Sequence, residues 1–96
     1  MAKFAITLES LLRRFGTAAM PVLVDVRRRE VYDKADTVIP TAVWRDHKRA
    51  AEWAAGLPRG RDVVVYCVHG HQVGESAAAL LRAAGVTAFF LEGGIE

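Results

Sequence analysis

The chain contains little cysteine, little net charge and no long apolar run. Cys67 is the only cysteine among 96 residues, which excludes an internal disulfide and gives no sign of an oxidising compartment. No apolar stretch approaches the roughly 18 residues that a transmembrane helix requires. Near the amino terminus, Glu9, Arg13 and Arg14 interrupt the apolar residues too early for a secretory signal. We therefore expect a cytoplasmic protein that does not bind a membrane.

Charges of both signs are nearly balanced. The 13 basic and 11 acidic residues give a net charge of +2, and the densest basic run is only Arg27 to Arg29. No aromatic stacking platform or recognition motif accompanies these charges, so we expect a solvated surface and no nucleic-acid partner. A chain of 96 residues with 52% apolar content can bury one hydrophobic core. We expect a single domain over residues 1–96.

Helix signals and apolar strand signals alternate along the chain. Helices are predicted over residues 8–15, 47–55 and 74–84, the first two with Thr7 and Asp46 as N-caps. Buried strands are predicted over residues 22–26, 63–66 and 86–91. This alternation predicts an α/β fold with a parallel twisted sheet flanked by helices. Ligands of such sheets bind at the carboxyl ends of the strands, where Asp25 and Cys67 are expected.

Cys67 ends a predicted strand and precedes a short loop and a helix. Backbone N–H groups of such a loop and of the first helical turn can point at the sulfur, with the helix dipole behind them. That environment stabilises a thiolate and makes the cysteine a candidate nucleophile. The alternative is an inert cysteine that packs as a small apolar residue. The strand–loop–helix context favours the reactive cysteine.

Four segments, in this order, resemble the single-domain rhodaneses, a family of sulfurtransferases. Leu23 to Arg27 is similar to the family's Asp-x-Arg strand end, and Ile39 to Ala42 to its Ile-Pro-Gly-Ala turn. Val65 to Gly70 is similar to the active-site strand and loop. Residues 84–94 are similar to the closing strand and its Gly-Gly. The resemblance covers essentially the whole chain and implies a rhodanese-like domain.

The resemblance also implies a reaction. Cys67 would take a sulfane sulfur from thiosulfate or a persulfide donor and hold it as a persulfide. A thiol, cyanide or the cysteine of a partner protein would then remove it, in ping-pong covalent catalysis that needs no cofactor. The cradle for the sulfur would be the backbone amides of Val68, His69, Gly70, His71, Gln72 and Val73. Asp25 and Arg27 are expected to form a buried ion pair that supports the adjoining loops, rather than to act on the substrate.

The chain departs from the family's pattern at several positions. Many relatives carry Arg at the fifth position after the cysteine, where this chain has Gln72. Gln offers thiosulfate only a neutral donor, so persulfide donors become more favourable. Thr41 stands where relatives usually have Gly, and Tyr32 to Ile39 is longer than the common form. Relatives continue through a tryptophan and a final helix, which we expect to be missing or truncated after residue 96.

Three other interpretations compete with sulfur transfer. Cys67, His69 and His71 alternate in a tight loop, which is poor geometry for zinc, so no metal site is expected. Cysteine phosphatases and arsenate reductases share the strand–loop–helix layout, but they need Arg at the sixth position after the cysteine, and this chain has Val73 there. A rhodanese-like module that senses sulfur or redox state, or binds a protein without turnover, stays open as an alternative.

Overall fold

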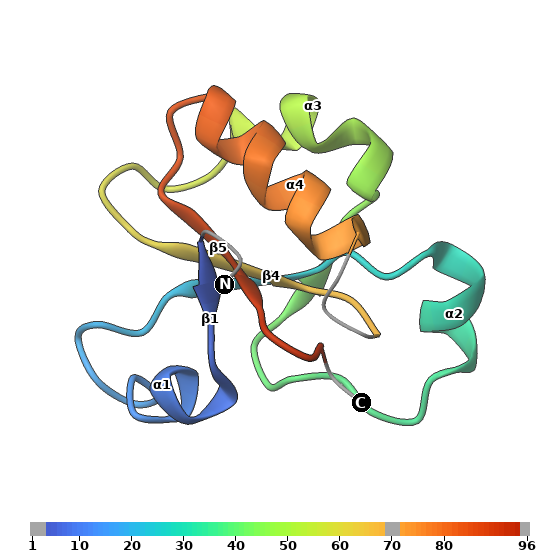
Figure 1. Cartoon of the computed structure of the whole chain (residues 1–96), viewed down its shortest axis with the longest axis horizontal. Helices are drawn as coiled ribbons and strands as arrows, with labels where there is room; N and C mark the ends of the chain where they lie inside the picture. The colour runs from blue at the N-terminus through green and yellow to red at the C-terminus, as the bar shows by residue number, and fades with distance from the viewer. Residues whose placement is uncertain (1–3, 69–71, 95–96) are drawn as a thin grey trace.

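The computed structural model describes residues 4–68 and 72–94. Within them the chain forms one five-stranded sheet with the strand order β1-β5-β4-β2-β3, and every neighbouring pair is parallel (Figure 1). The strands are β1 (Ala5–Ile6), β2 (Val22–Asp25), β3 (Val43–Trp44), β4 (Val63–Tyr66) and β5 (Ala88–Leu91). The predicted α/β fold with a parallel sheet is confirmed.

Helices connect the strands and cover both faces of the sheet. They are α1 (Leu8–Leu12), α2 (Arg29–Lys34), the 3-10 turn η1 (His47–Arg49), α3 (Ala50–Ala54) and α4 (Gln72–Ala83). Figure 1 shows α3 and α4 side by side on one face of the sheet and α1 on the other. Within the described ranges, no helix is both long and apolar enough to cross a membrane.

The central position of β4 in the sheet explains why its sequence is apolar without interruption. Val63 and Val65 pack in the cluster with α3 and α4, whereas Val64 and Tyr66 pack in the cluster with Leu11 of α1. All four β4 side chains are fully buried. Because successive strand residues point to opposite faces, a strand covered on both sides needs apolar residues at every position.

The predicted N-caps are present, β1, α2 and β3 were not predicted, and the predicted helices differ from the observed ones at their ends. The Thr7 hydroxyl accepts the Ser10 N–H at 3.1 Å, and the Asp46 carboxylate accepts the Lys48 N–H at 2.9 Å. The first helix is shorter than predicted, because hydrogen-bonded turns replace regular helix after Leu12. The second begins as the η1 turn, and α4 begins earlier than predicted, at Gln72.

Candidate functional site

Cys67 directly follows β4, at the carboxyl edge of the central strand. The Val26 N–H donates to the Tyr66 carbonyl at 2.9 Å, so the pairing of this strand with β2 continues up to the cysteine. The Cys67 side chain is a free thiol and is 8% exposed. A Cβ placed on Gly74 would lie 3.7 Å from its Sγ atom, so the first turns of α4 pass directly beside the sulfur. Cys67 therefore lies where it was predicted.

Only part of the predicted cradle falls within the described residues. His69, Gly70 and His71 lie outside them. Val68 is half-buried beside the cysteine, and Val73 packs against the core under α4. Gln72 is the first residue of α4. Its backbone N–H is therefore one of the donors at the start of the helix that have no partner within the helix. The contact of these amides with a bound sulfur stays a prediction.

The turn after β5 closes against the backbone that follows β4. Gly94 has a φ of +68°, and its N–H donates to the Leu91 carbonyl at 3.1 Å. A Cβ at Gly94 would overlap the carbonyl oxygens of Cys67 and Val68. Only glycine fits this approach at position 94, whereas Gly93 is favoured by its positive φ of +81°. The contact places the end of the β5 turn directly on the segment that carries the sulfur.

Asp25 and Arg27 form the predicted buried ion pair. The Arg27 Nε atom lies 3.0 Å from both carboxylate oxygens of Asp25, and one terminal nitrogen lies 2.6 Å from Oδ2. Their side chains are 0% and 3% exposed, respectively, and the hydrogen bonds to Asp25 raise the pKa of Arg27. The same guanidinium donates to the Thr37 carbonyl at 3.0 Å. Removing one partner of such a pair costs about 3–5 kcal/mol, because a buried charge is left uncompensated.

Tyr66 links this ion pair to the strand that carries the cysteine, and the sequence analysis did not single it out. Its hydroxyl accepts the Ile39 N–H at 3.2 Å, and its ring centre lies 5.7 Å from the Arg27 guanidinium carbon. Burial raises the pKa of Tyr66 well above its ordinary value. The sequence did contain a signal for this contact: a tyrosine in a strand buried on both faces needs a hydrogen-bond partner for its hydroxyl. Here that partner lies in the loop before β3.

The sequence and the fold of the chain match one family of known proteins. A family model described as a rhodanese-like domain matches residues 7–96, which is nearly the whole chain. The chain belongs to the rhodanese-like domain family. Among proteins with curated descriptions, none matches it.

Solved rhodanese-like structures share the fold over almost the full length of the chain. The rhodanese homologue of Thermus thermophilus is 29% identical with a TM-score of 0.72, and 95% of each chain is covered. The rhodanese-like domain protein of Staphylococcus aureus is 23% identical with a TM-score of 0.80, over 95% of this chain and 86% of that chain. A rhodanese-related protein of Thermoplasma volcanium is 23% identical with a TM-score of 0.79, over 96% of this chain and 86% of that chain.

The zinc ligands weighed from the sequence can be placed only in part within the described residues of this rhodanese-like domain. The described residues contain no group of three or more His, Cys, Asp or Glu side chains that could hold a metal ion. The zinc set that includes His69 and His71 lies partly outside the described residues. The loop carries no Arg at the sixth position after Cys67, because Val73 stands there. Trp44 lines a pocket beside α2.

Proposed function

We propose that this rhodanese-like domain is a sulfurtransferase that uses Cys67 as its nucleophile. The observation that carries the proposal is the position of the sulfur. It lies at the carboxyl end of the central strand, against the first turns of α4, in a chain of this family. Backbone N–H groups at a helix start favour a negative charge, and the reaction needs a charged sulfur before and after transfer.

The reaction proceeds in two balanced steps. In the first, the Cys67 thiolate attacks the outer sulfur of thiosulfate, and the bond to the sulfonate group breaks. Sulfite leaves with that electron pair, and Cys67 holds the sulfur as a persulfide. In the second, an acceptor thiolate attacks the outer sulfur, and the electron pair of the broken S–S bond returns to Cys67. No cofactor takes part, because the sulfane sulfur is passed on without a net change in oxidation state.

The donor is proposed to be a persulfide in preference to thiosulfate. Thiosulfate is a dianion, which a guanidinium in the loop would hold by charge-assisted hydrogen bonds. This chain has Gln72 at the position where many relatives carry Arg, so that contact is reduced to a neutral one. Since a single cysteine is typical of a reducing compartment, the proposal places the reaction in the cytoplasm.

Mass spectrometry of the intact protein tests the proposal. Incubation with a small persulfide donor or thiosulfate should add about 32 Da, the mass of one sulfur, and cyanide should remove it. The assignment is direct, because the chain has no other cysteine. Cys67→Ser should gain no sulfur and show no turnover. Failure of the wild-type protein to gain the sulfur would contradict the proposal, whereas a stable persulfide that no acceptor removes would favour the sensing module.

A further inference from the structure

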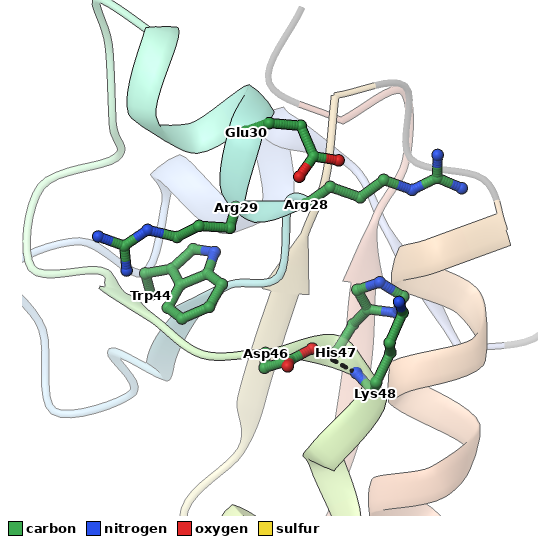
Figure 2. A pocket seen from close by; sticks show the side chains of 7 residues that line it. All are labelled: Arg28, Arg29, Glu30, Trp44, Asp46, His47 and Lys48. Atoms are coloured by element: carbon green, nitrogen blue, oxygen red, sulfur yellow. Dashed lines mark hydrogen bonds between the residues drawn. The ribbon is translucent and has the colours of Figure 1, made fainter.

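A small pocket of about 150 Å³ opens at the carboxyl edge of the sheet, between the start of α2 and η1. Figure 2 shows Arg28 and Glu30 along one side of the pocket, His47 and Lys48 along the other, and Trp44 at one end. The volume admits an amino-acid-sized group. None of these lining residues belongs to the cysteine loop.

Two of the charged groups around the pocket are already engaged within the fold. Arg29 pairs with Asp33 at 3.0 Å, and its guanidinium carbon lies 4.9 Å from the Trp44 ring centre. The Asp46 carboxylate accepts the Lys48 backbone N–H and so caps η1. These contacts position the Trp44 ring and the η1 backbone, so both sides of the pocket are held in place within the fold.

Side chains of both signs remain available in the pocket. Within the described part of the chain, the structure gives no ion pair to Arg28, Glu30 or Lys48. Arg28 and Lys48 can hold a carboxylate, and Glu30 can hold an ammonium group. A site with both charges suits a zwitterion, whereas Glu30 would repel an inorganic dianion. The lining therefore matches the α-amino-acid group of an organic molecule.

The pocket lies close to the reactive edge. Arg28 comes shortly after Val26, whose N–H donates to the carbonyl of Tyr66, the residue before Cys67. On the other side of the pocket, η1 packs against α4, the helix that passes beside the sulfur. A molecule seated in the pocket can therefore extend along the edge toward Cys67.

We propose that this pocket binds the α-amino-acid group of the sulfur carrier, so that the domain prefers zwitterionic thiols and their persulfides. The inference rests on the proposed function, and it names the class of carrier. Arg28 and Lys48 bind the carboxylate, and Glu30 binds the ammonium group. When the carrier is the acceptor, its thiolate attacks the outer sulfur of the Cys67 persulfide, and the carrier leaves as a persulfide.

A set of small acceptor thiols separates the two charges. Cysteine carries both, 3-mercaptopropionate only the carboxylate, cysteamine only the ammonium, and 2-mercaptoethanol neither. The ratio kcat/KM for each acceptor is measured with the wild-type protein and with Glu30→Gln and Lys48→Gln. Comparing one thiol across variants removes differences in intrinsic thiol reactivity. γ-Glutamylcysteine and its desamino analogue glutarylcysteine repeat the test with a longer distance between the α-amino-acid group and the sulfur.

Each variant should affect only the thiols that carry the matching charge. Glu30→Gln should lower kcat/KM for cysteine or γ-glutamylcysteine about threefold, as expected for an exposed ion pair, and leave the desamino analogues unchanged. Lys48→Gln should lower kcat/KM about threefold for the carboxylate thiols and leave cysteamine unchanged. Arg59→Gln, an exposed cation on the segment before β4, is the matched control and should change none of them.

The outcomes distinguish this inference from the proposed function. Suppose that the thiols turn over but Glu30→Gln changes kcat/KM equally for the amino-acid thiols and their desamino analogues, in both the short and the long pair. The pocket then does not bind the carrier. Sulfur transfer by Cys67 would stand in that case. If Cys67 forms no persulfide, the first half-reaction already fails, and both the proposed function and this inference fall together.

Discussion

Thr41 occupies a turn position that favours glycine. The Ala42 N–H donates to the Ile39 carbonyl at 3.0 Å, which closes a four-residue turn with Pro40 in its second position. Thr41, in the third position, has a φ of +73°. This is the pattern of a type II turn, whose third residue must adopt the left-handed conformation. The similar turn of the rhodanese family usually has Gly there, so the chain carries local backbone strain at this point.

The expected gain from Thr41→Gly follows from two opposing terms. The left-handed conformation costs an L-residue roughly 1–2 kcal/mol, and a β-branched side chain lies toward the upper end. Glycine loses about 0.5–1 kcal/mol more backbone entropy on folding. Thr41 is exposed, so its side chain contributes little packing that would be lost. The net expectation is a stabilisation of about 1 kcal/mol.

Urea denaturation measures this difference directly. The midpoint should rise without a change in slope, and the melting temperature should rise by about 4–8 °C, as expected for a domain of this size. Thr87→Gly is the matched control, because Thr87 is exposed and its φ is not positive. That variant should lose stability through the entropy term alone. If Thr41→Gly also loses stability, the turn is not strained and the argument fails.

Three further changes test the site. Gly94→Ala should lower stability more than Gly93→Ala does, because a Cβ at Gly94 would overlap backbone carbonyls, whereas one at Gly93 meets nothing within 4 Å; equal losses in urea denaturation would contradict this contact. Gln72→Arg should raise thiosulfate turnover about fivefold, if about 1 kcal/mol is gained in the transition state, and should change turnover with an uncharged persulfide donor much less. An equal effect on both donors would place the side chain at position 72 away from the donor. Because folding raises the pKa of Tyr66, the native state keeps a proton that the unfolded chain loses, so stability should fall as the pH rises above about 10. Tyr66→Phe should weaken this fall, measured in a series of denaturation curves between about pH 9 and 11. If the variant loses stability with pH as steeply as the wild-type protein, the fall does not come from Tyr66.

The sheet could be predicted where its strands are long and buried on both faces. Residues 63–66 are four consecutive apolar residues, and the structure has β4 over the same range. β1 and β3 escaped prediction because each has only two residues, too few for a periodic pattern. They exist through long-range pairing with β5 and β2, respectively, and local sequence carries no information about such partners.

The helix α2 escaped prediction for a different reason. It has no buried residue, so the apolar spacing that predicts an amphipathic helix is absent. Its local charges were nevertheless informative. Glu30 lies in the first turn, Lys34 in the last, and Arg29 pairs with Asp33 one turn later at 3.0 Å. Such pairs stabilise a short exposed helix by favourable interactions along its surface and with its dipole.

At the candidate site, the positions of the residues and the local Asp25–Arg27 ion pair were predictable, whereas the contacts between distant segments were not. The strand signal placed Asp25 and Cys67 at one edge, because all carboxyl ends of a parallel sheet lie together. The closeness of Gly94 to the cysteine backbone depends on how the turn after β5 folds back. The bond from Ile39 to the Tyr66 hydroxyl likewise joins segments that are distant in sequence. Contacts of this kind follow from three-dimensional packing, which no spacing rule contains.

At the carboxyl edge of the sheet, side-chain hydrogen bonds hold the structure together because the backbone pairing of the strands ends there. β2 and β4 pair in register up to Asp25 and Tyr66. Beyond that point, Arg27 binds the Asp25 carboxylate, and the Trp44 indole N–H donates to the Arg27 carbonyl at 2.8 Å. Asp25 and Arg27 are buried and Trp44 is half-buried, so water competes little for these bonds. Cys67 therefore leaves the sheet beside side chains that are already fixed, which is the preorganisation that the proposed nucleophile would need to meet a donor without rearranging the backbone.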